Sequence, residues 1–271
     1  MTSKALVVRA GVLGAAAATV LGLAMPAAAQ EAYSAPRATD YGAVTSLPDW
    51  TGIWYPDWTQ LFSTRGARPV LTERGAQILD AYNESIREHG PNQEAQAQCL
   101  PPGLPGLMQQ PYPIEFLFSP GRVTILTEAY EQARRIYTDG RPLPEDFDLF
   151  YNGNSVGYWD GDMLVIDTVG LQPRTNIVAG LPHTEASRVH EHIWRADETH
   201  LYVEFTITNP ELLAQPYVTR IAYKLDNEFP LREYVCSENN RLQSGEDGAN
   251  IDLGFDHLDG PDPFGPPPAG E

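Results

Sequence analysis

Cysteine and positive charge are both scarce in this chain. It has 2 Cys among 271 residues, and its 18 Lys and Arg stand against 36 Asp and Glu, which gives a net charge of −18. Such an acidic chain repels phosphate backbones and anionic lipid. We therefore expect neither nucleic acid nor a membrane surface as a partner.

Several cofactor motifs are also missing. The sequence has no P-loop and no dinucleotide fingerprint that follows a strand and opens a helix. It has no HExxH sequence and no dense Cys/His pattern for a metal. We expect no cofactor, and any chemistry must come from side chains alone.

A short apolar run lies at the N-terminus, and it is too short and too Ala-rich for a good membrane anchor. Lys4 and Arg9 precede GVLGAAAATVLGLAM, and AMPAAAQ supplies small residues for cleavage. This pattern is typical of a Sec-type signal peptide, which predicts export to a bacterial periplasm. We expect a signal peptide over 1–29, an irregular lead-in over 30–48, a folded domain over 49–245, and a disordered acidic Pro/Gly tail over 246–271.

The two cysteines, Cys99 and Cys236, are far apart in the sequence. In an oxidising compartment the default for two cysteines is one disulfide. Two buried free thiols are the alternative.

The folded region predicts one helix and many strands. LTERGAQILDAYNESIREHG has a helical stripe, with Thr72 as its N-cap and Gly90 at its C-terminal end. A Pro/Gly loop, CLPPGLPGLMQQPYP, follows and is long enough for a lid or strap. Alternating runs after it, including a hairpin at Asp160-Gly161, predict about eight to ten antiparallel strands. The fold class is therefore mainly β, as an up-and-down barrel with one helix on its N-terminal side.

Several runs resemble a large family of uncharacterised exported proteobacterial proteins. They are TGIW, CLPPG, RRIYTDGR, GNSVGYWDGDMLVIDTVG, PHTEASRVHEHI and EYVCSENN, which span about 50–240. The family has Arg where this chain has His192, so the resemblance does not make His192 a family-wide ligand. Gly52-Ile53-Trp54 is also similar to the start of lipocalin-like barrels, where a Trp lies beneath an Arg from a late strand. Arg220 is our candidate for that Arg.

The segment LPHTEASRVHEHIW holds three of the six histidines. Side chains alternate along a strand, so Glu191 shares a face with Val189 and Ile193. If that face lines the barrel, burial makes Glu191 a candidate general acid or base. The alternative is a Glu paired with an internal Arg. His183 is expected at the barrel mouth as an acid/base group or a ligand contact, and an ordinary loop histidine is the alternative.

Other residues complete the expected site. Arg135 and Tyr137 share a strand face and would clamp an anionic oxygen if they point inward, whereas a surface ion-pair cluster is the alternative. Carboxylates, a histidine and aromatic side chains would form the ligand pocket, although most of the aromatics also suit a core. The catalytic candidates are Glu191, His183, Arg135 and Tyr137, and the candidates for ligand binding are Trp54, Tyr112, Phe116, Glu128, Trp159, Asp167 and His190.

A metal site is the weaker interpretation of the histidines. His190 and His192 share a strand face, and His183 would have to join them from the preceding loop.

Three functions remain open. One is cofactor-independent acid/base chemistry of the lyase, isomerase or cyclase type on a small apolar or aromatic molecule in the lumen. A second is a periplasmic carrier for such a molecule. The third is a structural envelope protein with a filled core. The sequence does not predict the oligomeric state or the ligand.

Overall fold

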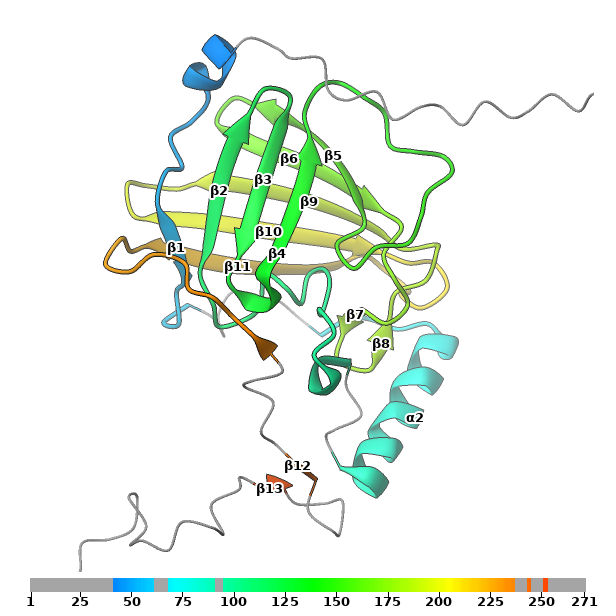
Figure 1. Cartoon of the computed structure of the whole chain (residues 1–271). Helices are drawn as coiled ribbons and strands as arrows, with labels where there is room; N and C mark the ends of the chain where they lie inside the picture. The colour runs from blue at the N-terminus through cyan, green and yellow to red at the C-terminus, as the bar shows by residue number, and fades with distance from the viewer. Residues whose placement is uncertain (1–40, 61–67, 91–94, 237–242, 245–250, 253–271) are drawn as a thin grey trace, which may run out of the picture. The chain divides into compact units, whose positions relative to one another are not determined.

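The computed structural model describes residues 41–60, 68–90, 95–236, 243–244 and 251–252. All of them belong to one compact unit, Pro36–Glu271. Nine strands form a closed barrel (Figure 1) in the spatial order β1-β11-β10-β9-β6-β5-β4-β3-β2. The strands are β1 (Ile53–Pro56), β2 (Ile114–Ser119), β3 (Arg122–Thr127), β4 (Gln132–Tyr137), β5 (Asn154–Asp160), β6 (Met163–Val169), β9 (Arg188–Arg195), β10 (His200–Thr208) and β11 (Tyr217–Leu225).

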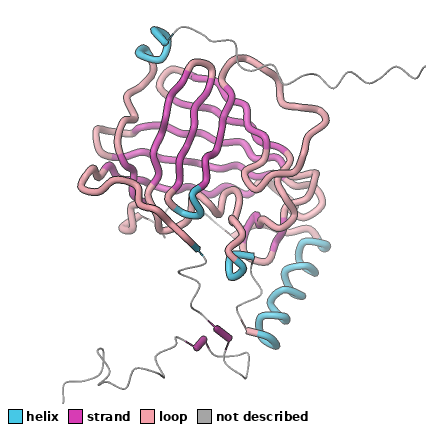
Figure 2. Tube along the Cα trace, in the orientation of Figure 1, coloured by secondary structure: helices cyan, strands magenta, loops and turns pink. Residues whose placement is uncertain are grey.

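The remaining elements are short, apart from one helix, and the helical segments lie outside the sheet (Figure 2). They are η1 (Tyr41–Ser46), α2 (Glu73–His89), η3 (Ala95–Gln98), η4 (Ala129–Glu131), and the pairs β7 (Asn176–Val178) with β8 (Leu181–Pro182) and β12 (Gln243–Ser244) with β13 (Ile251–Asp252). The predicted mainly β barrel with one main helix is confirmed.

One strand pair departs from the expected up-and-down order. β4 and β5 run parallel, with Ile136 opposite Ser155 and Tyr137 opposite Val156. All other neighbouring pairs in the barrel are antiparallel. Parallel neighbours cannot be joined by a tight turn. The segment 138–153 therefore makes the crossover, which strand periodicity does not reveal.

Helix α2 begins and ends where its capping residues predict. The Thr72 side chain accepts from Gly75 N, and Gly90, with φ of 80°, donates its N–H to the Ile86 carbonyl. The helix packs closely at Gly75, where an added Cβ would lie 2.2 Å from the Leu212 carbonyl oxygen. The absence of a side chain at Gly75 thus allows α2 to contact the loop after β10.

Trp54 closes one end of the barrel, which we call the floor. Its indole is fully buried, and the Arg195 guanidinium carbon lies 5.6 Å from its ring centroid. Arg195 also donates to the backbone carbonyls of Asp49, Asp197 and Glu198. The expectation that Arg220 covers this Trp is wrong, because the Arg220 side chain lies on the outer face. It pairs there with Glu204 at 2.5 Å.

The loop after Cys99 closes the opposite end, which we call the mouth. We call residues 102–110 the plug, because the Leu104 and Met108 side chains are fully buried in the barrel core. The Tyr223 hydroxyl donates to the Met108 carbonyl at 2.5 Å. The Pro/Gly loop, which we expected to be a lid or strap, is therefore inserted into the end of the barrel.

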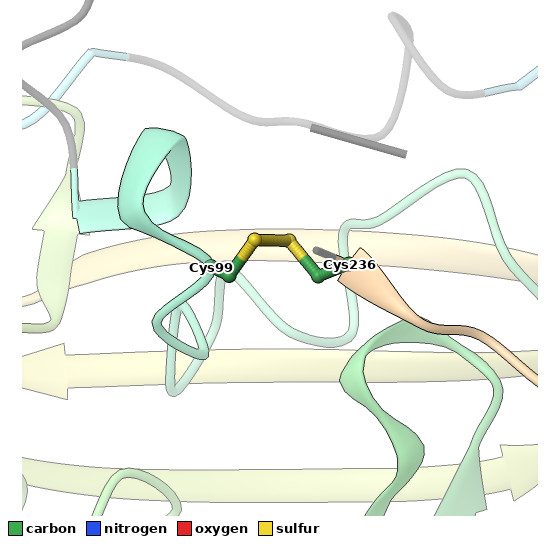
Figure 3. Close-up of a disulfide and its surroundings, with 2 residues drawn as sticks. All are labelled: Cys99 and Cys236. Atoms are coloured by element: carbon green, nitrogen blue, oxygen red, sulfur yellow. A yellow bond between two sulfur atoms is a disulfide. The ribbon is translucent and has the colours of Figure 1, made fainter. Parts of the chain in front are cut away.

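The predicted disulfide between Cys99 and Cys236 is confirmed (Figure 3). It joins Cys99, three residues before the plug, to the chain that follows β11. A disulfide fits an oxidising compartment.

The expected signal peptide over 1–29 lies outside the described residues. Most of the lead-in (30–48) and of the tail (246–271) does too, although η1 falls within the lead-in and β13 within the tail. Within the described residues, we find no helix with the length and apolar character needed to span a bilayer.

Candidate functional site

A buried ion pair lies inside the barrel. The face of β9 that carries Glu191 points inward, and Glu191 has no exposed surface, which settles the orientation that the sequence left open. Arg134 of β4 donates to Glu191 from both terminal nitrogens, at 2.7 and 2.5 Å. One of these nitrogens also donates to Ser155 and Thr168, at 3.3 and 3.2 Å. The alternative of a Glu paired with an internal Arg is therefore the one observed.

The interior around this pair is filled with side chains. A side chain that lined a void large enough for water would retain accessible surface, yet many core residues retain none. These include Ile125, Ile136, Leu164, Ile166, Ile193, Val203 and Phe205. Trp54 and Phe116, which we expected to contact a ligand in the lumen, belong to this packed core, and Trp159 packs against it.

Polar side chains are not spread evenly through the interior. The cross-strand row of Trp159, Leu164, Ile193, Val203 and Ile221, in the floor half of the barrel, is apolar. The buried polar residues of the barrel strands lie nearer the mouth than this row; they are Thr127, Arg134, Ser155, Thr168, Glu191 and Thr219. Burying polar groups costs free energy unless they are paired. The mouth half is thus where the fold retains polar chemistry.

The expected inward orientation of Arg135 is wrong. Arg134 and Ile136 are buried on β4, whereas Arg135 is exposed and Tyr137 is half-buried on the outer face. The Arg141 guanidinium carbon lies 3.9 Å from the centroid of the Tyr137 ring. Ile136 is apolar and points into the barrel. Because side chains alternate along a strand, Arg134 points inward as well and Arg135 points outward.

Ser155 lies within a run, GNSVG at 153–157, that has the spacing of a serine-hydrolase nucleophile. That motif requires an exposed Ser at a strand-to-helix turn. Ser155 is instead a buried residue of β5, 2.8 Å from the Thr168 hydroxyl. The run serves the interior polar cluster here.

His183 is buried beneath the plug and is not an exposed loop residue. Its Nε2 donates to the Leu104 carbonyl at 2.7 Å, while its Nδ1 is buried without a partner. Burial lowers the pKa of His183 to about 4, against the smaller raising effect of the hydrogen bond to Leu104. The imidazole is therefore neutral at pH 7 and attaches the plug to the chain after β8.

Asp167 and His190 lie on the outer face and not in the lumen. They are cross-strand neighbours, with His190 Nδ1 2.7 Å from Asp167 Oδ1, and both side chains are partly exposed. The His192 ring lies beside that of His190, with centroids 4.8 Å apart. Among the described residues no group of three or more His, Cys, Asp or Glu is arranged to hold a metal. The metal interpretation, which required His183 to join this pair, therefore has no support.

Glu128 and Tyr112 contact the chain that follows β11. Glu128 Oε2 accepts from Arg232 N at 2.7 Å. The ring of Tyr112 packs against Tyr234, whose ring in turn contacts Tyr130. Burial, followed by the neighbouring tyrosines, raises the pKa of Tyr130 to about 12. These residues hold the C-terminal segment that carries Cys236, which is a structural position.

A cleft of about 470 Å³ lies at the mouth, between the plug and β7, and sequence reasoning missed it. We call it the mouth cleft. The run of glutamines after Met108 was its only signal in the sequence. Its lining residues are Gln96, Pro102, Gly106, Gln109, Gln110, Arg174, Asn176, Ile177, Val178, Ala179 and Tyr217.

Two other hollows lie elsewhere. One of about 510 Å³ is on the outer wall near the β5–β6 hairpin, lined by Asp160, Asp162, Met163, His192, Trp194, Arg195 and Glu204. The other, of about 360 Å³, lies at the floor beside η1. The mouth cleft alone of these three borders the plug.

No protein-family model matches the chain, and the search of curated proteins finds no match. The resemblance to an exported proteobacterial family stays a prediction from the motifs.

Proposed function

We propose that the protein is a periplasmic barrel that binds a small molecule in the mouth cleft. The observation that carries this proposal is a preformed cleft that combines amide side chains with apolar walls. Sites for small molecules are usually concave, mostly apolar and fitted with a few polar groups. The volume of about 470 Å³ lies within the usual range for such sites.

The plug gives this cleft a rigid wall. Leu104 and Met108 anchor it in the core, and hydrogen bonds from His183 and Tyr223 hold their carbonyls. At Gly103, with φ of 67°, an added Cβ would lie 2.5 Å from the Thr175 side chain, so the plug lies directly against the chain before β7. A wall that does not need ordering on binding retains more of the interaction free energy for the ligand.

The packed interior favours the cleft over the lumen as the ligand's place. A molecule in the lumen would have to displace plug or core side chains, and the loss of a buried Leu or Met costs about 2–5 kcal/mol. The cleft requires no such displacement.

The experiment is native mass spectrometry of the mature protein purified from its own host. A bound small molecule should be detected and should be lost in Ala179→Trp, which fills the cleft at an exposed lining position. Ala196→Trp, exposed in the β9–β10 turn at the floor end, is the matched control and should keep it. A ligand retained by Ala179→Trp would refute the proposal, and so would a protein that neither carries nor binds a small molecule; the latter would favour a structural envelope role.

Acid/base chemistry on the bound molecule is the second candidate, of the lyase or isomerase type. Two buried atoms near the mouth favour it, because Arg134 Nε and His183 Nδ1 have no partner. For a molecule to reach these atoms and Glu191, the plug would have to leave its seat in the core. Incubation of the co-purified molecule tests this, since turnover that is lost in Glu191→Gln under conditions where circular dichroism shows the variant to be folded would support catalysis. An unchanged molecule would leave binding alone.

A further inference from the structure

The mouth cleft differs in charge from the rest of the chain. The protein carries 36 acidic and 18 basic residues. Among the cleft's lining residues there is no Asp or Glu, and Arg174 is the only charged side chain. An anion therefore meets less repulsion here than the net charge of the protein implies.

Arg174 is available to bind such an anion. It is exposed at the cleft, and in the described part of the chain no hydrogen bond or ion pair involves its guanidinium. Other arginines are occupied, as with Arg220 on Glu204 and Arg188 on the carbonyls of Glu185 and Ser187. A free guanidinium suits a carboxylate, which it binds through two parallel hydrogen bonds.

Two glutamines of the plug supply hydrogen-bond acceptors, whereas Arg174 supplies donors. Gln109 Nε2 donates to the Thr219 hydroxyl at 3.4 Å, and Gln110 Nε2 donates to the Gly106 carbonyl at 3.1 Å. These contacts occupy amide nitrogens and leave the amide oxygens as acceptors. An acceptor in the cleft recognises a hydroxyl donor on a ligand.

The remaining walls are apolar. Pro102 and Val178 line the cleft from opposite sides, and the Tyr217 ring lies at the start of β11. Flat apolar bodies pack well against prolyl and aromatic surfaces.

We propose that the mouth cleft binds a hydroxylated carboxylic acid with a flat apolar body. Arg174 holds the carboxylate, and the Gln109 and Gln110 amide oxygens accept from the hydroxyl. This inference rests on the proposed binding function and adds the class of ligand to it.

Two probes of matched outline test the charge assignment. They are 4-hydroxybenzoate and 4-hydroxybenzamide, titrated calorimetrically into the mature, disulfide-bonded chain. We expect the carboxylate to bind at least about tenfold tighter, since charge-assisted hydrogen bonds are roughly twice as strong as neutral ones. Added salt should weaken the carboxylate and leave the amide unchanged.

Variants locate the effect. Arg174→Gln should reduce carboxylate affinity to that of the amide, whereas Arg87→Gln, an exposed arginine on α2, should change neither probe. Gln110→Leu should weaken both probes by a similar factor, because both carry the hydroxyl.

Three results would overturn the inference. They are equal affinity for the two probes, a carboxylate preference that survives Arg174→Gln, and no binding of 4-hydroxybenzoate at millimolar concentration. Equal affinities that Ala179→Trp abolishes would keep the cleft as a binding site and refute only the ligand class. A protein that neither binds a probe nor co-purifies with a molecule would refute both.

Discussion

Arg134 and Glu191 form a two-bond ion pair across the barrel interior, and their side chains are only 1% and 0% exposed. Removal of one partner leaves an uncompensated buried charge, which costs about 3–5 kcal/mol. We therefore expect Glu191→Gln to lower the free energy of unfolding by this amount in urea denaturation. Glu204→Gln, which breaks the partly exposed pair with Arg220, should cost less than about 1 kcal/mol.

The double substitution Arg134→Met with Glu191→Leu should recover most of this loss, because it removes both charges and keeps apolar volume. A double variant no more stable than Glu191→Gln would contradict the assignment of the cost to an orphaned Arg134.

His183 should make stability depend on pH. Burial holds its pKa at about 4, below the usual 6.5, so the unfolded chain binds the proton more readily. The stabilisation by neutral His183 is complete above pH 6.5 and is lost as the pH falls toward 4. Between pH 7.5 and 4.5 we expect a loss of about 2–3 kcal/mol from this residue.

Histidine 183 can be isolated by comparison with His183→Gln, whose amide can still donate to the Leu104 carbonyl. The free energy of unfolding is measured for both proteins at pH 7.5 and at pH 4.5. The loss in the wild type minus the loss in His183→Gln gives the contribution of His183 to the acid sensitivity. An equal loss in both proteins would show that His183 does not cause the acid sensitivity.

The Cys99–Cys236 bond joins residues 137 positions apart. A ring of that length restricts the unfolded chain and contributes about 5 kcal/mol on chain-entropy grounds. Replacement of both cysteines by Ala should lower stability by several kcal/mol. Addition of reductant should then have no further effect on the double variant. A midpoint equal to wild type would show that the tether is dispensable.

Gly75→Ala should reverse the usual helix-propensity rule. Alanine in place of a helical glycine normally stabilises by about 1 kcal/mol. At Gly75 the new Cβ would lie 2.2 Å from the Leu212 carbonyl oxygen, so the helix must shift. We expect a net loss of about 1–3 kcal/mol in thermal unfolding. Asn83→Ala, at an exposed position of α2, should be neutral or slightly stabilising.

Local periodicity and capping predict much of the barrel. Thr72 and Gly90 bound α2, and alternation groups Val189, Glu191 and Ile193 on one face of β9, which the structure shows to be the inner face. Both patterns work because they depend on neighbours in sequence. The sequence also predicts the disulfide, because only two cysteines are present.

The errors concern contacts between distant segments. β4 has two adjacent arginines, so the sequence did not show which of them points into the barrel. Ile136 is buried, and Arg134 therefore points inward with it. The floor arginine is Arg195 because β9 ends beside Trp54, which depends on strand order. The mouth cleft forms where the plug lies against β7. The periodicity of the sequence does not predict that these two distant segments are in contact.

The covalent ring closed by Cys99 and Cys236 contains every barrel strand except β1. β1 lies outside this ring and is held between β11 and β2 by strand pairing and by the packing of Trp54 in the core. Cleavage of the chain between β1 and α2 would therefore yield a peptide that carries β1 and a disulfide-closed fragment whose barrel lacks that one strand. A synthetic copy of residues 49–60 should reassociate with that fragment, which makes this barrel a scaffold for split-protein complementation.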